Sequence, residues 1–151
     1  MPAANQPSEL KFEGTRTADD VVCLVDDDPS IRKSVGRLLE SAGFKVKTFD
    51  EAEPFLEYLS RNQVPVAVLD IWMEHMTGME LLAHLCARSP KTRIIFITGH
   101  EDSGAQATVM QAGAFGFLIK PFDEAKFLNL IGSAFAPDTL QTTATKMSDS
   151  P

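Results

Sequence analysis

Apolar and polar residues alternate in blocks along most of the chain, and the spacing of the apolar positions changes from block to block. Four short runs are almost wholly apolar: VVCLV from residue 21, VPVAVLD from 64, RIIFITG from 93 and AFGFLIK from 114. Continuous apolar runs of this length are typical of parallel strands that are covered on both faces. A fifth run, FKVKTF from residue 44, alternates apolar and polar positions and predicts a strand with one solvent-facing side, near an edge of the sheet.

Helical spacing follows each of these runs. The first helix is expected after DDDPS, because four apolar residues recur at helical spacing between Ile31 and Leu39. Asp28 stands directly before a proline and suits an N-cap, whereas Gly43 stands where the helix should stop.

Four further helices are expected: DEAEPFLEYLS from residue 50, GMELLAHLCAR from 78, SGAQATVMQAG from 103 and DEAKFLNLIGSAF from 123. The start of the first of these lies between Asp50 and Glu53, because Pro54 lacks an amide hydrogen. Asp123 is expected to cap the last helix. The apolar stripe of the helix from residue 78 is formed by Met79, Leu82, Leu85 and Cys86.

Five successive strand–helix pairs predict an α/β protein with a parallel sheet and helices on both faces. The size and the single half-polar strand favour a flavodoxin-like (βα)5 three-layer sandwich, with the five strands in the order 2-1-3-4-5. The domain is expected over residues 21–135. A flexible N-terminal arm is expected over 1–20, and a disordered tail rich in Ser, Thr, Asp and Pro over 136–151.

Composition and charge argue against several classes of function. The net charge of −7 and the absence of a Lys/Arg-rich run argue against direct binding to nucleic acid. No apolar run approaches the roughly 20 residues of a membrane span, and the N-terminus lacks the layout of a signal peptide. Cys23 and Cys86 fall inside apolar periodic segments, which predicts reduced, buried thiols in a cytoplasmic protein.

Reactive polar residues stand at the ends of four predicted strands. These are Asp26 and Asp27, then Asp70, Thr98 and Lys120. Each has an ordinary explanation when taken alone: a solvated turn or cap, a strand-end hydroxyl, or a surface lysine. Because the carboxyl ends of parallel strands share one edge, and the first and third strands flank the switch point, we expect all five side chains to meet in one crevice.

These residue types suit phosphoryl chemistry. The carboxylates of Asp26, Asp27 and Asp70 are hard oxygen ligands of the kind that Mg²⁺ prefers, and a cation would relieve their mutual repulsion. A carboxylate beside the ion can act as a nucleophile toward a phosphoryl group. Lys120 can then stabilise the phosphoryl oxygens by charge, and Thr98 can do so by a hydrogen bond.

Four motifs, VDDDPS, LDIWMEHMTGMEL, FITGH and FGFLIKPF, occur in this order. With them the chain resembles the receiver domains of two-component response regulators, most closely the FixJ-like branch, over about residues 21–135. The resemblance implies that Asp70 accepts a phosphoryl group from a histidine kinase or a histidine phosphotransferase. It also implies that Asp26 and Asp27 hold Mg²⁺, together with Asp70 and the backbone carbonyl of Trp72.

The same resemblance assigns the switch. Lys120 would pair with the phosphoryl group, Thr98 would move toward it, and Phe117 would rotate with Thr98. Pro121 matches the cis-peptide position of the family. The surface of the last two helices and the strand between them would transmit the signal and could form a homodimer. The chain is therefore expected to be a phosphoacceptor that catalyses only its own phosphorylation and dephosphorylation, not an enzyme with a separate substrate.

The sequence also departs from the family pattern. Glu74 occupies a position that usually holds proline, which adds a charge and leaves the shape of that loop open. Trp72 is either a partly exposed loop aromatic or a shield that keeps water from the phosphoryl group. Among the histidines, His84 is expected on a helix surface, whereas His75 and His100 follow strand ends and could overhang the crevice.

Two alternatives concern the class of protein. Asp-x-Asp after a strand also occurs in haloacid-dehalogenase-type phosphatases, where Asp26 would be the nucleophile and Asp28 the acid/base. That reading leaves Asp70 without a role and lacks the late acidic motif of that family. FixJ-like receivers usually precede a DNA-binding helix-turn-helix, and this chain has no room for one after residue 135. It is either a receiver fragment of a longer transcription regulator or, as Met1 and the uneventful tail favour, a stand-alone receiver.

Overall fold

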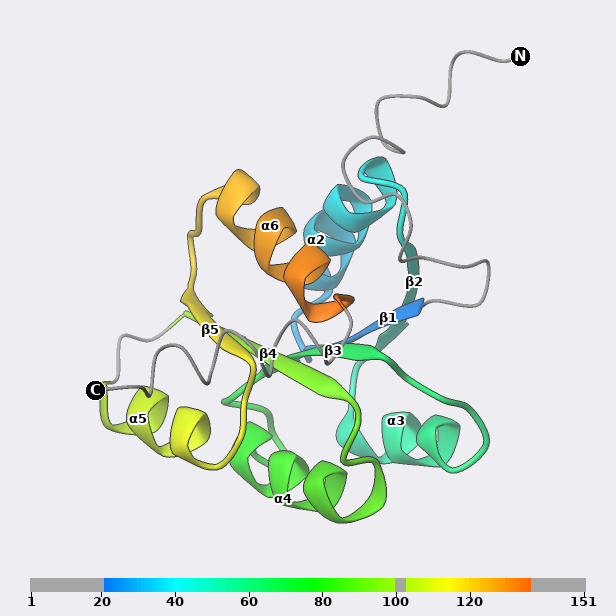
Figure 1. The fold of residues 1–151 in the computed structure, drawn as a ribbon, viewed down its shortest axis with the longest axis vertical. Helices are drawn as coiled ribbons and strands as arrows, with labels where there is room; N and C mark the ends of the chain where they lie inside the picture. Colours follow the sequence, from blue (N-terminus) through cyan, green and yellow to red (C-terminus); the bar gives the residue numbers. More distant parts are fainter. Residues whose placement is uncertain (1–20, 100–102, 137–151) are drawn as a thin grey trace.

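The structure is a computed structural model in which residues 21–99 and 103–136 are described. In these residues five parallel strands alternate with five helices (Figure 1). The strands are β1 (Val21–Val25), β2 (Lys45–Phe49), β3 (Val66–Asp70), β4 (Arg93–Thr98) and β5 (Gly116–Ile119). The helices are α2 (Pro29–Ser41), α3 (Ala52–Leu59), α4 (Gly78–Arg88), α5 (Ser103–Gln111) and α6 (Glu124–Ala134).

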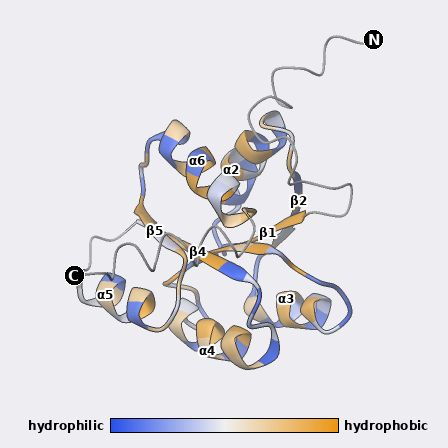
Figure 2. Ribbon diagram, viewed as in Figure 1, coloured by the Kyte–Doolittle hydropathy of each residue, from blue (hydrophilic) through white to orange (hydrophobic). Residues whose placement is uncertain are grey.

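The sheet order is β2-β1-β3-β4-β5, which confirms the expected flavodoxin-like topology. Helices α2 and α6 cover one face of the sheet, and α3, α4 and α5 cover the other (Figure 1). The helices carry both hydrophobic and hydrophilic residues (Figure 2), and their buried residues, such as Leu39, Leu85 and Phe127, are apolar. The chain therefore forms three layers with a hydrophobic core on each side of the sheet.

Each core is built around a few fully buried side chains. Phe55, Leu81 and Val109 pack on the α3–α5 side, and Leu39 and Phe127 pack on the α2–α6 side. Burying a side chain of this size contributes about 1.5–3 kcal/mol, so these contacts hold the strand ends in fixed positions.

Local capping signals set several helix boundaries. Asp28 caps α2 by accepting a hydrogen bond from the Ser30 amide at 2.9 Å, and Asp123 caps α6 in the same way. Gly43 follows α2 with a φ of 97°, a left-handed conformation that glycine adopts without strain. These three expectations are confirmed. The open question about α3 is resolved in favour of a start at Ala52, after an N-cap residue whose side chain makes no capping hydrogen bond.

The prediction that Cys86 is buried is wrong. The buried stripe of α4 contains Leu81, Leu82 and Leu85, whereas Cys86 is exposed and its Sγ lies 3.7 Å from a backbone carbonyl of the α5–β5 turn. One residue turns a helix by about 100°, so the position after Leu85 already leaves the face that packs on the sheet. Cys23 in β1 is buried, as expected.

The remaining expectations concern strand β2, the two ends of the chain and membrane-spanning helices. Strand β2 is an edge strand, and Lys45, Lys47 and Thr48 on it are exposed, which confirms the prediction of a solvent-facing side. The proposed arm over 1–20, His100 and residues 137–151 of the proposed tail lie outside the described residues. None of the helices in the described ranges has both the length and the apolar character that crossing a bilayer requires.

Candidate functional site

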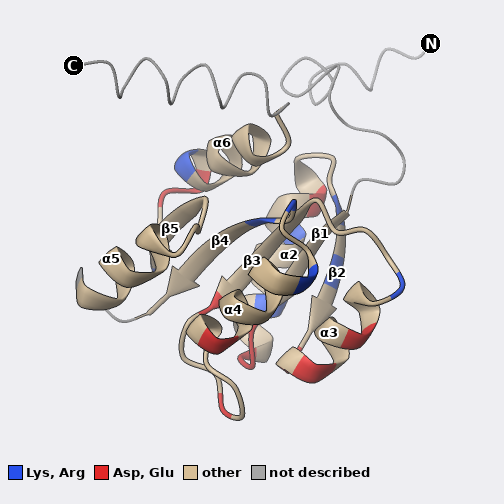
Figure 3. Cartoon of the chain, turned by 60° about the horizontal axis from the view of Figure 1, so that its bottom comes forward, with Lys and Arg blue, Asp and Glu red and all other residues tan. Residues whose placement is uncertain are grey.

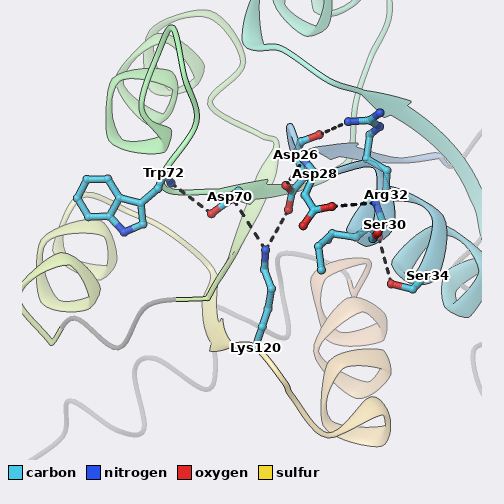
Figure 4. A network of polar contacts seen from close by, with 9 residues as sticks. Asp26, Asp28, Ser30, Arg32, Ser34, Asp70, Trp72 and Lys120 are labelled. Atoms are coloured by element: carbon cyan, nitrogen blue, oxygen red, sulfur yellow. Dashed lines mark hydrogen bonds and ion pairs between the residues drawn. The ribbon is translucent and has the colours of Figure 1, made fainter.

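Residues from three strand ends meet at the carboxyl edge of the sheet. Asp26 and Asp27 directly follow β1, and Asp70 ends β3; one carboxylate oxygen from each lies within 4.8 Å of the others. Lys120 follows β5, and its Nζ lies 3.2 Å from Oδ2 of Asp26 and 3.8 Å from Oδ2 of Asp70 (Figure 4). The expected convergence of these four residues is therefore confirmed across a separation of 94 positions.

Asp26 makes contacts through its amide, its carbonyl and both of its carboxylate oxygens. Its amide donates to the Phe49 carbonyl at 3.1 Å, and its carbonyl accepts from Nη1 of Arg32 at 2.7 Å. One carboxylate oxygen accepts from the Asp28 amide at 2.9 Å, and the other faces Lys120. The residue is 0% exposed, so its charge is stabilised by these partners and not by bulk water.

Asp70 is positioned by the loop that follows it and by the start of α4. Its Oδ1 accepts from the Trp72 amide at 3.2 Å, and the Gly78 amide donates to the Ile71 carbonyl at 2.7 Å. A Cβ on Gly78 would lie 2.7 Å from the Asp70 carbonyl oxygen, closer than real Cβ contacts come. Glycine is therefore required here. Sequence reasoning missed this residue, although the TGME stretch carries a capping-box signal, and Thr77 and Glu80 do form that box.

The pKa of Asp70 is raised from its ordinary value of 3.8 to about 6, first by burial and next by the neighbouring Asp26 charge. Lys120 and the hydrogen bond from the Trp72 amide oppose this rise without cancelling it. Desolvation and like charge both disfavour the ionised form. A carboxylate in this position gains from a nearby cation, because the cation offsets both effects.

Thr98 stands at the carboxyl end of β4, whereas Phe117 on β5 is in register with Phe96, two positions before that end. Asp70 is in register with Ile97, which places Thr98 one residue further along the neighbouring strand. Thr98 is buried, and its carbonyl accepts a hydrogen bond from the Lys120 amide at 2.7 Å. Phe117 is half-buried against the core on the α3–α5 side. The Lys120–Pro121 peptide is cis, as expected.

The acidic cluster fits a divalent cation. Asp26, Asp27 and Asp70 together with Lys120 carry two formal negative charges in excess when all are ionised, and three carboxylate oxygens converge on one point. Mg²⁺ is bound in proteins by one or a few carboxylates together with water, so this donor set matches its preference.

The loop after Asp70 carries exposed residues. Trp72 is 42% exposed, and in Figure 4 its indole points away from the Lys120 ammonium. Glu74 and His75 are also exposed, with 3.8 Å between carboxylate and ring, and they line a cavity of about 180 Å³ that reaches Asp27. His84 is half-buried on α4, not fully at the surface.

An open parallel sheet with an acidic crevice at its switch point, faced by a lysine that follows the last strand, defines a class of protein: doubly wound α/β domains, whose ligands bind at the carboxyl ends of the strands. The sequence of the chain makes the assignment more specific. Residues 22–132 match the response regulator receiver domain, and the chain belongs to this family.

Two relatives and one solved structure illustrate the similarity. The transcriptional regulatory protein FixJ of Bradyrhizobium diazoefficiens is 37% identical over 75% of this chain and 55% of its own length. The transcriptional regulator NtrC of Escherichia coli is 37% identical over 77% of this chain and 25% of its own length. The beryllofluoride-activated NtrC4 receiver domain dimer superposes with a TM-score of 0.73 at 33% identity, covering 76% of this chain and 95% of that one. The chain thus spans about half of FixJ and a quarter of NtrC.

Proposed function

We propose that Asp70 is the phosphoacceptor of a two-component phosphorelay. The observation that carries this proposal is the meeting of Asp70 with Asp26, Asp27 and Lys120 in one crevice, with carboxylate oxygens within 4.8 Å and an ammonium within 3.8 Å. Of these carboxylates, Asp70 ends β3, which lies between β1 and β4 in the sheet. Its raised pKa reflects a partly desolvated oxygen, which is easier to bring into contact with a phosphorus atom than a fully hydrated one.

In the proposed step an Asp70 oxygen attacks phosphorus while the bond from phosphorus to the donor breaks. With a phosphohistidine donor the P–N bond breaks, and the imidazole nitrogen keeps the electron pair and takes up a proton. In this proposal Lys120 pairs with the transferred phosphoryl oxygens, and the Thr98 hydroxyl donates a hydrogen bond to them. Catalysis by this chain then consists of positioning and charge neutralisation, and it extends only to its own phosphorylation and dephosphorylation.

We propose Asp26, Asp27, Asp70 and the Trp72 backbone carbonyl as the Mg²⁺ ligands. The ion would supply charge neutralisation at the phosphoryl oxygens. The protein's own contribution is to hold Asp26 by its hydrogen bonds with Phe49, Arg32 and Asp28, so that the acidic pair keeps its position as the phosphoryl group arrives.

The partners follow from the family. We propose a histidine kinase or histidine phosphotransferase as the donor, and the surface of α5, β5 and α6 as the face that changes on phosphorylation, through Thr98 and Phe117. The NtrC4 receiver is a dimer in its activated form, and we propose that the same face allows this chain to form a homodimer. Because FixJ and NtrC extend well beyond the matched region, an output domain on a longer protein is a second possibility for the signal.

The experiment is phosphorylation by a small acyl phosphate with Mg²⁺, followed by intact mass. We expect one phosphoryl group on the parent, none on Asp70→Asn, and parent-like uptake by Asp50→Asn, an equally conservative change of an exposed carboxylate. Uptake by Asp70→Asn would overturn the proposal. The phosphatase alternative predicts instead that Asp26→Asn abolishes the turnover of phosphate esters; family membership and the place of Asp70 in the cluster both weigh against it.

A further inference from the structure

Strand β2 is an edge strand of the sheet formed by the described residues. Within the described part of the chain β2 pairs only with β1. The Phe49 carbonyl accepts from the Asp26 amide on the β1 side. Because backbone groups alternate in direction along a parallel strand, those of Thr48 and Val46 point away from β1, toward the outer edge.

Positive charge borders this edge on both faces. On the α2 face, Arg32, Lys33 and Arg37 line a cavity of about 410 Å³ whose floor includes Val46 and Thr48. On the opposite face lie Lys45 and Lys47, the latter with its Nζ 5.5 Å from the centre of the Tyr58 ring. Five of the 14 basic residues of the chain therefore lie on α2 and β2, although the net charge is −7; Figure 3 shows blue on both elements.

Most of this charge is uncompensated. Lys33, Arg37 and Lys45 form no ion pair with any residue of the described ranges, and Glu40 is the one acidic residue that lines the cavity. Arg32 is the exception, since its guanidinium donates to the Asp26 carbonyl. The α2 face thus carries a surplus of positive charge next to the outward backbone groups of β2.

We propose that the α2–β2 edge is a docking site for an extended, acidic segment of a partner protein, which adds as a further strand beside β2. Strand addition uses main-chain hydrogen bonds for affinity and the flanking side chains for specificity. Side chains of an added strand alternate between the two faces, so carboxylates could reach Arg37 and Lys33 on one face and Lys45 and Lys47 on the other.

The arrangement of the charges favours this occupant over others. A small anion would use one spot, whereas the cations flank the strand along its length and on both sides. A second copy of this chain, pairing edge to edge, would bring like charges together, which is how lysines normally protect an edge strand. An acidic strand would instead be attracted by these lysines. The lysines therefore favour an acidic partner and disfavour edge-to-edge pairing of two copies of this chain.

The test is a titration of the full, isotope-labelled chain with a short peptide in which pairs of glutamates alternate with pairs of threonines, so that an extended strand carries carboxylates on both faces; binding is followed by amide chemical shifts. We expect saturable binding at low salt, with the largest shifts at Val46 and Thr48. The double reversal Lys33→Glu/Arg37→Glu should weaken binding about tenfold, from two lost ion pairs and added repulsion. The matched reversal Arg88→Glu/Lys91→Glu changes the net charge equally at exposed positions elsewhere and should have less than about a twofold effect.

A second variant separates strand addition from simple charge attraction. Thr48→Pro removes an outward N–H at an edge strand, where proline is tolerated, and should weaken peptide binding while leaving urea unfolding unchanged. The proposal is overturned if the peptide shifts other surfaces, if both charge reversals weaken binding equally, if Thr48→Pro binds like the parent, or if duplex DNA displaces the peptide. Asp70→Asn should bind the peptide normally, so this result is independent of the proposed phosphorylation.

Discussion

Replacing Asp70 with asparagine is expected to stabilise the metal-free protein at neutral pH. The side chain is almost fully buried, and its pKa is raised to about 6 by burial first and by Asp26 next. Asparagine has the same shape and keeps an oxygen that can accept from the Trp72 amide, but it carries no charge. The substitution therefore removes the electrostatic cost and retains most of the packing.

The size of the effect follows from the pKa. A rise from 3.8 to about 6 makes ionisation about 3 kcal/mol more costly in the folded state than in the unfolded state, at about 1.4 kcal/mol per pH unit. Between these values the folded protein binds more protons, so the free energy of unfolding of the parent falls as the pH rises, and it is fully lowered above about pH 6. We expect a gain of up to about 3 kcal/mol at pH 7.5, because the raised pKa already includes the opposing attraction of Lys120.

The assay is urea unfolding of both proteins between pH 4 and pH 8 without Mg²⁺. The difference in free energy of unfolding between the two proteins should be near zero at about pH 4 and should grow as the pH rises to about 6. Asp50→Asn, an exposed carboxylate, serves as control and should stay within about 0.5 kcal/mol of the parent at every pH. A gain that does not depend on pH, or a less stable Asp70→Asn protein at pH 7.5, would refute the electrostatic reasoning. Added Mg²⁺ should stabilise the parent and not the variant.

Three further predictions concern the same site. Gly78→Ala should destabilise the protein by about 2 kcal/mol or more, because the new Cβ meets backbone and ring atoms within 2.8 Å. Gly36→Ala is the control: its new Cβ has nothing within 4 Å, and the substitution should stabilise the protein by about 0.5–1 kcal/mol. Urea unfolding measures both changes, and equal effects would contradict the packing argument. Lys120→Met should destabilise the protein by about 3 kcal/mol, since it leaves buried carboxylates without their cation; adding Mg²⁺ should recover part of this loss, and full stability in its absence would count against the ion pairs. If Trp72 shields the phosphoryl group, Trp72→Ala should lose phosphate from Asp70 faster than the parent; an unchanged lifetime, which the outward-pointing indole favours, would make Trp72 an ordinary loop aromatic.

Much of the architecture could be predicted from the sequence, because it depends on neighbouring residues. The continuous apolar runs specify buried parallel strands, and the half-polar run from residue 44 specifies the edge strand β2. Asp28, Gly43 and Asp123 mark helix ends through bonds and conformations that span two or three residues. The acidic pair, Asp70 and Lys120 could be placed at one edge of the sheet, since the carboxyl ends of parallel strands must share it.

Other features required the tertiary structure. Whether Cys86 is buried depends on the angle at which α4 lies on the sheet, and a difference of one position moves a side chain by about 100° around the helix. The need for glycine at position 78 arises from the approach of a helix start to the Asp70 backbone, and the raised Asp70 pKa arises from groups on separate strands. The sequence by itself determined the elements and the chemical groups at their ends, because periodicity and capping are local. Distances, burial and charge balance were decided only by packing, because they join residues that are far apart along the chain.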